Sequence, residues 1–169
     1  MRMRALVALS VLTLGASACA TAGPPASPAP PPAPGGAPVA VEGYDWFYSP
    51  ADDSARLAYG LAESDDLKLG LDCRRGSGRL EMVAIAEKGA KAEIHLESGG
   101  ETEQFPAAAE PSELHDGVFL SAGASTAEPV FQRFRRVGWL AQWRGGEREA
   151  YAPHPGSAPD IERFFAFCG

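Results

Sequence analysis

Two alternating stretches stand at the centre of the sequence, LKLGLDC at residues 67–73 and RLEMVAIAE at residues 79–87. In the first, every second side chain is apolar, from Leu67 to Cys73. In the second stretch, Leu80 begins a set of apolar side chains at every second position, and the alternate positions include charged side chains. Side chains at every second position share one face of an extended strand. Both stretches therefore predict strands with one buried and one solvated face, as is typical of antiparallel sheets.

Glycine-containing turns connect the predicted strands into hairpins. The segment RGSG at 75–78, the pair Gly99-Gly100 and the pair Gly145-Gly146 tolerate the positive φ that tight turns require. The predicted hairpins pair 67–73 with 79–87, 91–97 with 101–105, and 137–143 with 147–152, and further strands are expected around 57–61 and 118–121.

Two segments have helical spacing. Residues 129–136, PVFQRFRR, begin with a proline, which suits the first turn of a helix. Near the C-terminus, Ser157 and Asp160 have the spacing of a capping box. An apolar stripe follows at i, i+3, i+4 and i+7, formed by Ile161, Phe164, Phe165 and Cys168. The prediction is a sheet-dominated α+β domain, an antiparallel β-sandwich or a barrel-like sheet, closed by this C-terminal helix.

Composition divides the 169 residues into three parts. Residues 1–18 contain two arginines followed by a ten-residue apolar run at 5–14, a pattern that indicates a signal peptide. The apolar run is too short to span a bilayer as a helix. Residues 19–40 are a Pro/Ala-rich linker headed by a cysteine. Residues 41–169 hold every aromatic side chain and predict one globular domain. The formal charge of -7 and the pI near 5.0 argue against a general nucleic-acid binder.

The segment Ala16-Ser17-Ala18-Cys19 resembles the lipobox of bacterial lipoproteins, where cleavage leaves the cysteine N-terminal and lipid-modified. Ala16 stands where that family usually has leucine. The resemblance implies lipidation of Cys19. Because Ala20 follows instead of an aspartate, it also implies an outer-membrane anchor facing the periplasm. The alternative is a soluble periplasmic or secreted protein, produced by ordinary cleavage after Ala18 or Ala20.

The linker has the composition of a spacer. Residues 21–40 carry eight prolines and no charged or aromatic side chain, so they cannot bury enough apolar surface to fold. In a polyproline conformation of ~3.1 Å per residue, this segment would reach ~60 Å. The P-x-x-P spacings at 28–31 and 31–34 allow a docking motif as the alternative function.

The three cysteines divide into one anchor and one pair. Lipidation of Cys19 leaves Cys73 and Cys168, an even number for an oxidising compartment. Cys73 ends the central predicted strand and Cys168 ends the C-terminal apolar stripe, so both are expected on buried faces. We predict a Cys73–Cys168 disulfide, and two buried thiols are the alternative.

No motif for catalysis or cofactor binding occurs: the chain has no G-x-S-x-G, no phosphate loop and no C-x-x-C. No catalytic residue and no cofactor is assigned. On a predicted strand, His95 lies between Glu93 and Glu97, and these three could bind a divalent metal from one face. A second acidic cluster in a predicted loop consists of Glu113, His115 and Asp116. Both sets also suit a solvated surface, and no metal site is assigned.

Aromatic and basic side chains gather just before the Gly145-Gly146 turn. Trp139 and Trp143 are four residues apart, so on a strand their side chains share a face. The arginines stand out in an acidic chain. An exposed cluster would suit contact with a glycan or a protein, whereas a buried cluster would be core. The candidate contact patch is Arg133, Arg135, Arg136, Trp139 and Trp143.

The sequence resembles small periplasmic accessory proteins of bacteria, some of them associated with type VI secretion. The resemblance is carried by YDWFY at 44–48, Asp52-Asp53-Ser54 and the two predicted elements that end in cysteine. The resemblance implies a fold type and a compartment, and it carries no catalytic residue.

These features predict a non-enzymatic envelope lipoprotein whose disulfide-bonded domain binds an envelope protein or a glycan. Its contacts would be a membrane through the lipid and this partner, without nucleic acid, and its oligomeric state is left open. One alternative is a small periplasmic hydrolase or metal-dependent enzyme that uses His95 or His115. Another is a wall-protecting protein similar to lysozyme inhibitors. Converging carboxylates in a deep pocket would favour the enzyme, and an exposed aromatic-basic patch would favour the binder.

Overall fold

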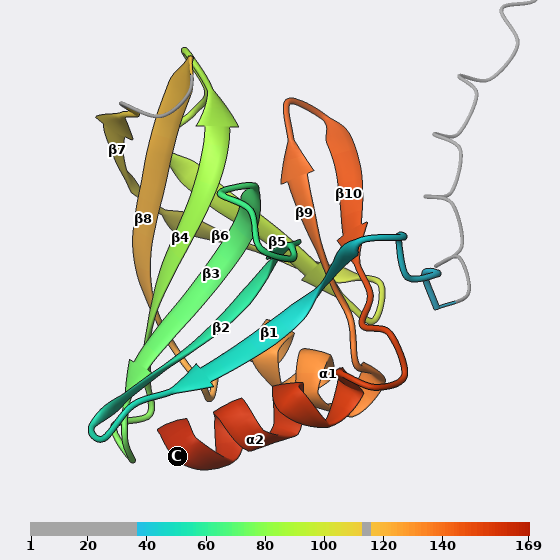
Figure 1. The fold of residues 1–169 in the computed structure, drawn as a ribbon. Coiled ribbons are helices and arrows are strands. Elements are labelled where there is room, and N and C mark those ends of the chain that lie inside the picture. The colour runs from blue at the N-terminus through green and yellow to red at the C-terminus, as the bar shows by residue number, and fades with distance from the viewer. Residues whose placement is uncertain (1–36, 113–115) are drawn as a thin grey trace, which may run out of the picture. The chain divides into compact units, whose positions relative to one another are not determined.

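The computed structural model describes residues 37–112 and 116–169, which belong to one compact unit. The predicted signal peptide, Cys19 and the linker up to residue 36 lie outside the described residues, as do Glu113 and His115. The described chain is mostly strand, and its strand pairs are antiparallel (Figure 1).

Six strands form the larger sheet, in the order β1-β2-β3-β4-β8-β7. The first four are consecutive hairpin partners, and β8 returns beside β4 to continue the sheet. The bounds are β1 Tyr44–Pro50, β2 Ser54–Leu61, β3 Leu67–Arg74, β4 Arg79–Glu87, β7 Ala108–Pro111 and β8 Gly117–Ser125.

Four strands form the second sheet, in the order β10-β9-β5-β6. Two hairpins, β5–β6 and β9–β10, are joined through the pairing of β5 with β9. The bounds are β5 Glu93–Ser98, β6 Glu101–Pro106, β9 Leu140–Arg144 and β10 Glu147–Tyr151.

The main core lies between the two sheets. Leu57, Leu71 and Met82 of the larger sheet are fully buried in one cluster with Ile94 and Leu96 of β5. The prediction of a sheet-dominated α+β fold with a C-terminal helix is confirmed. Within the described residues the sheets are separate and open, so the arrangement is sandwich-like and the barrel-like alternative is wrong.

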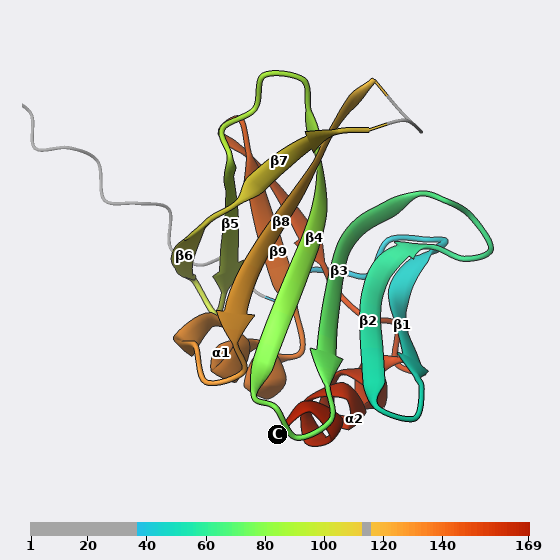
Figure 2. The ribbon, with the colours of Figure 1, turned by 90° about the vertical axis from the view of Figure 1, so that its left-hand side faces the viewer.

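Two helices lie together at one end of the sheets (Figure 2). Helix α1 (Pro129–Val137) packs on β5 and β6, and α2 (Ala158–Cys168) packs on β1 and β2. Each turns its apolar stripe into the core, because these positions recur at helical spacing. The buried helix residues are Val130, Phe131 and Phe134 in α1 and Ile161, Phe164, Phe165 and Cys168 in α2.

Two local predictions are wrong. Ser157 makes no side-chain capping hydrogen bond to α2. Its hydroxyl donates to the Asp45 carboxylate, and the His154 carbonyl lies 3.0 Å from the same oxygen. The strand expected at 137–143 begins later, at Leu140. Helix α1 runs through Val137, and Gly138 ends it with a left-handed φ of 81°, a conformation that glycine adopts readily.

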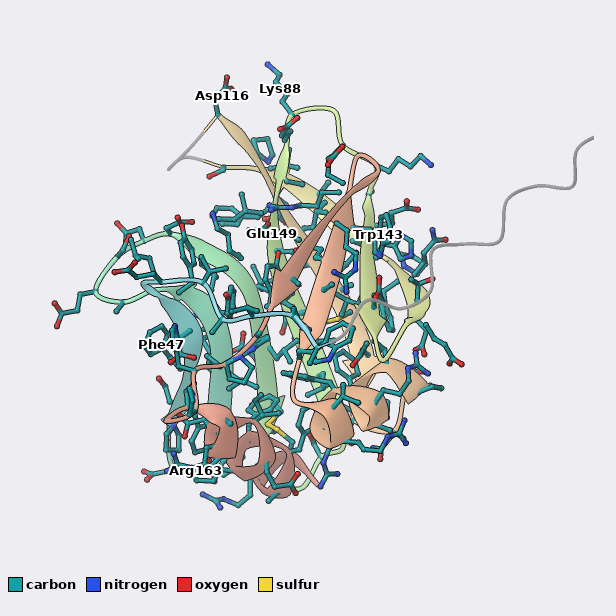
Figure 3. All side chains as sticks on the ribbon, turned by 90° about the vertical axis from the view of Figure 1, so that its right-hand side faces the viewer. Phe47, Lys88, Asp116, Trp143, Glu149 and Arg163 are labelled. Carbon is teal, nitrogen blue, oxygen red and sulfur yellow. A yellow bond between two sulfur atoms is a disulfide. The ribbon has the colours of Figure 1, made fainter. Side chains whose placement is uncertain are left out.

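The predicted disulfide between Cys73 and Cys168 is present, with a Cα–Cα distance of 5.7 Å, so the two-thiol alternative is wrong. It joins the end of β3 to the end of α2 and appears as the yellow bond in Figure 3. The turn after β3 is held to the same helix end, because the Gly78 amide donates to the Cys168 carbonyl over 2.8 Å. The covalent bond and this hydrogen bond fix the β3–β4 turn against α2.

Candidate functional site

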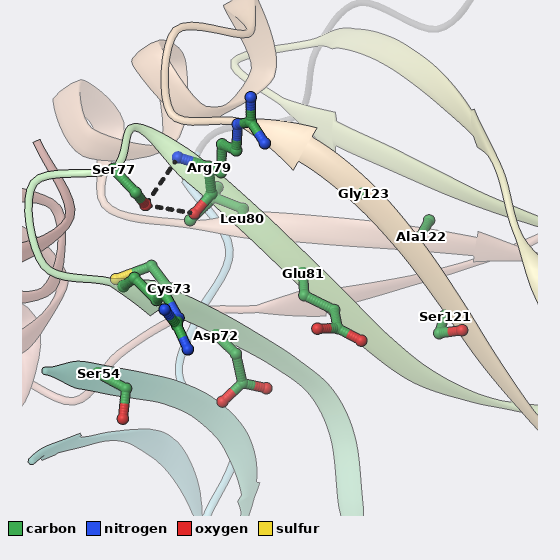
Figure 4. A pocket seen from close by; sticks show the side chains of 11 residues that line it. Ser54, Asp72, Cys73, Ser77, Arg79, Leu80, Glu81, Ser121, Ala122 and Gly123 are labelled. Carbon is green, nitrogen blue, oxygen red and sulfur yellow. Dashed lines mark hydrogen bonds between the residues drawn. The ribbon is translucent and has the colours of Figure 1, made fainter.

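A groove of about 530 Å³ lies on the outer face of the six-stranded sheet, over β3, β4 and β8 (Figure 4). Most of its lining residues carry polar side chains, from the solvated positions of these strands and from the β3–β4 turn, but apolar atoms contribute most of the lining surface. The lining residues are Ser54, Asp72, Cys73, Arg74, Ser77, Arg79, Leu80, Glu81, Ser121, Ala122 and Gly123.

Strand register brings two carboxylates together in this groove. Asp72 on β3 is the direct cross-strand partner of Glu81 on β4. Their neighbours Leu71 and Leu80 point into the core, so the alternation of each strand turns the two carboxylates outward. Directly opposed residues have Cβ atoms about 4.5–5.5 Å apart, so both carboxylates can contact one ligand.

The floor beside Glu81 is open because the next strand carries no side chain there. Gly123 on β8 is the cross-strand partner of Glu81. A Cβ atom built on Gly123 would meet no atom within 4 Å. Ser121, two residues earlier on β8, contributes a small hydroxyl to the same lining. A ligand can therefore approach the backbone of β8 closely.

An arginine fixes the direction of the Asp72 carboxylate. Arg56 on β2 donates from Nε to Oδ1 and from Nη2 to Oδ2, each over 2.8 Å. The hydrogen bonds to Asp72 raise the pKa of Arg56, so the guanidinium stays charged. The Arg56 side chain is 52% exposed, so solvent screens the pair and its contribution to stability is small. The pair holds the carboxylate in place beside the groove.

The β3–β4 turn builds one end of the groove. The Arg79 amide donates to the Ser77 hydroxyl over 3.2 Å, as Figure 4 shows. The turn is anchored by the disulfide of Cys73, which is itself part of the lining. This end of the groove is therefore preformed.

The lining is balanced in formal charge. Asp72 and Glu81 accept hydrogen bonds, Arg74 and Arg79 donate them, and three serine hydroxyls can do both. A neutral ligand that carries many hydroxyl groups can match donors and acceptors of this kind. A strongly charged ligand would instead meet a side chain of its own sign.

Of the two tryptophans in the predicted contact patch, Trp143 is on β9 of the other sheet and Trp139 comes just before that strand. Trp139 is buried in a small cluster outside the main core. Trp143, which Figure 3 labels, is half-buried. The Trp143 indole donates to Glu97 over 2.8 Å. Arg148 donates twice to Glu97, over 2.8 and 2.9 Å, and its guanidinium lies 5.4 Å from the centre of the Trp139 ring.

The three arginines of the predicted contact patch do not join this tryptophan cluster. Arg133 donates to the Ser98 carbonyl and the Glu103 carboxylate, which ties α1 to the β5–β6 hairpin. Arg135 pairs with Glu162 on α2. Arg136 is exposed. Since Arg133 and Arg135 serve contacts between elements, the five residues do not form one open surface.

Two of the three candidate metal ligands, Glu93, His95 and Glu97, are engaged in other contacts. Glu97 is only 7% exposed and binds Arg148 and Trp143. The hydrogen bonds from Arg148 lower the pKa of Glu97, which keeps it ionised as the partner of a guanidinium. His95 stacks on Trp143 with ring centres 6.1 Å apart. Across the described part of the chain, no group of three or more His, Cys, Asp and Glu side chains is placed to hold a metal ion.

Sequence reasoning did not single out the groove residues. The alternation of the two central stretches did place Asp72 and Glu81 on solvated faces. Their direct opposition depends on the strand register, which the sequence does not state. The open floor at Gly123 depends on the return of β8 beside β4, a pairing between segments about forty residues apart.

The chain matches no protein-family model, no curated protein and no solved structure. Among the described residues, neither helix has the length and apolar character needed to cross a membrane.

Proposed function

We propose that residues 41–169 form a non-enzymatic binding domain of an envelope lipoprotein, and that its ligand is a neutral glycan held in the groove over β3, β4 and β8. The observation that carries the proposal is the lining of that groove: two carboxylates, two guanidinium groups and three hydroxyls around an open glycine floor. The volume of about 530 Å³ is in the range of small-molecule sites and would take a short oligosaccharide segment.

The N-terminal features support the envelope setting of this proposal. A lipobox-like segment ending at Cys19 and a proline-rich spacer suit a domain held away from a membrane. The Cys73–Cys168 disulfide suits an oxidising compartment. The outer-membrane anchor remains part of the proposal.

A glycan is favoured over a protein partner because charged side chains line the groove. The cores of protein interfaces are depleted in charged residues and enriched in aromatic ones. The described residues of the groove include four charged side chains and no aromatic ring. The larger aromatic side chains near the surface, Trp139 and Trp143, are instead held by Arg148 and Glu97.

The hydrolase alternative would use Asp72 and Glu81 as a catalytic pair. Retaining glycosidases have carboxyl groups about 5–5.5 Å apart, which cross-strand partners can reach. Such a pair needs both carboxyl groups: one attacks the substrate or activates water, and the other protonates the leaving group. Arg56 occupies both oxygens of Asp72, and this arrangement favours binding over hydrolysis.

Titration calorimetry of the full chain with neutral β-1,4-linked N-acetylglucosamine oligomers tests the proposal. We expect saturable binding, and a loss of affinity of at least tenfold in Gly123→Leu, whose side chain would occupy the open floor. The backbone of Gly123 is not in the left-handed region, so this variant is expected to fold. Glu87→Ala, on the neighbouring strand β4 and outside the groove lining, is the control and should bind like wild type. Absence of saturable binding, or full affinity in Gly123→Leu, would contradict the proposal.

A further inference from the structure

A second, smaller pocket lies where β1, β2 and β3 approach β10. Its volume is about 140 Å³. None of its residues belongs to the groove described above. It is lined by Val41, Tyr44, Tyr59, Lys68, Glu149 and Ala150.

The wall of this pocket includes the buried hydroxyl of Tyr59, which makes no hydrogen bond within the described residues. The residue is 2% exposed. Its ring is stacked between Tyr44, at 6.1 Å, and Tyr151, at 4.6 Å, so it cannot swing out to solvent. Burial raises the pKa of Tyr59, so the hydroxyl keeps its proton and remains a donor. Buried polar groups are nearly always paired, so an unpaired one in a pocket wall points to a ligand.

An ammonium group stands at the same pocket. Lys68 Nζ lies 2.8 Å from the Asp66 carboxylate and 5.2 Å from the centre of the Tyr44 ring. Tyr44 donates its own hydroxyl to Asp66. An ammonium has three N–H donors, and Asp66 accepts one. Lys68 can therefore donate to a ligand carboxylate together with the hydroxyl of Tyr59.

A carboxylate is contributed by β10. Glu149 pairs with Arg144 through Oε2, and the Tyr151 hydroxyl lies 3.4 Å from the same oxygen. Neither of these contacts uses its other oxygen, Oε1. It is the acceptor available to a ligand N–H group.

The dimensions limit the ligand to a few atoms. A cavity of about 150 Å³ holds a benzene molecule, which has six non-hydrogen atoms. A pocket of about 140 Å³ therefore takes a molecule of that size. With a cation and a phenol hydroxyl on one side and a carboxylate on the other, its complement carries a negative and a positive end.

We propose that this pocket binds a small zwitterionic amino acid of the size of glycine or alanine. Its carboxylate accepts hydrogen bonds from the Tyr59 hydroxyl and from Lys68, and its ammonium group donates to Glu149. The site is separate from the glycan groove, and either can be present without the other.

Calorimetric titration of the full chain with glycine, L-alanine and D-alanine tests the site, with propionate and ethylamine as probes that each lack one charged end. We expect saturable binding of at least one amino acid and binding at least tenfold weaker for propionate and ethylamine. No saturable binding of any of the three amino acids would overturn the proposal, since the pocket would then hold water only. Equal binding of propionate would overturn the role of Glu149.

Two variants separate recognition from folding. Tyr59→Phe removes only the hydroxyl, so we expect affinity to fall about tenfold or more, while the unfolding midpoint without ligand stays equal or rises. Tyr48→Phe, on β1 and outside the pocket lining, is the matched control and should bind like wild type. Unchanged affinity in Tyr59→Phe would overturn the proposal, as would an equal loss in both variants.

Discussion

Cys73, in the lining of the groove, is bonded to Cys168, the last residue of α2, across a sequence separation of 95 residues. The same helix end accepts hydrogen bonds from the β3–β4 turn, through the carbonyls of Phe167 and Cys168. One covalent bond therefore supports both the closure of the domain and one end of the candidate site.

Replacing both cysteines in Cys73→Ser/Cys168→Ser should lower the free energy of unfolding by about 2–5 kcal/mol, because the unfolded chain regains the freedom of a long loop. Urea unfolding measures this loss. Wild type unfolded in the presence of reductant should lose a similar amount. Equal midpoints for wild type and the double variant would show that the bond contributes nothing to stability.

Glu97→Gln should destabilise the domain at pH 7 by about 1–3 kcal/mol, since it removes the charge that Arg148 binds twice. Glu93→Gln, on the same strand and outside this cluster, is the matched control and should change stability little.

The effect of Glu97 should depend on pH in one direction. Arg148 lowers the pKa of Glu97 below its ordinary value of 4.5, so folding favours the ionised form. Its stabilising contribution is complete above about pH 4.5 and is lost as the pH falls through the folded pKa. The gap between wild type and Glu97→Gln in urea unfolding should therefore narrow on acidification. A gap that widens below pH 4.5 would contradict the assignment.

Trp46 and Phe47 are adjacent on β1 but should differ sharply on substitution. Trp46 is 1% exposed, and its indole donates to the Tyr151 carbonyl over 3.1 Å, whereas Phe47 is 38% exposed. Trp46→Phe should cost about 1–3 kcal/mol, because it leaves a small cavity and an unpaired carbonyl. Phe47→Leu should stay within about 0.5 kcal/mol in the same unfolding assay. Similar costs for the two variants would contradict the placement of β1.

The strands with alternating apolar residues and the glycine-containing turns could be predicted because each pattern lies within a short stretch of sequence. Strands β3 and β4, the β9–β10 hairpin and the apolar stripe of α2 follow from spacing alone. Strand β1 was not predicted, since its aromatic run does not alternate and only Trp46 is fully buried in it. Strand β7 was missed because all of its residues are exposed at the sheet edge.

The failures involve contacts between distant residues. Ser157 has a cap spacing, but Asp45, 112 residues away, accepts its hydroxyl hydrogen bond. The patch arginines looked available, but Glu162 and the β5–β6 hairpin bind Arg135 and Arg133. The groove itself depends on the register of Asp72 with Glu81, which only the paired strands define.

The most direct test of the glycan groove is a map of backbone amide chemical shifts during titration with a neutral N-acetylglucosamine oligomer. We expect saturable changes at Asp72, Glu81, Ser121 and Gly123, and none at the pocket of Tyr59. Changes confined to His95, Trp143 and Arg148, or no saturable change at all, would contradict it.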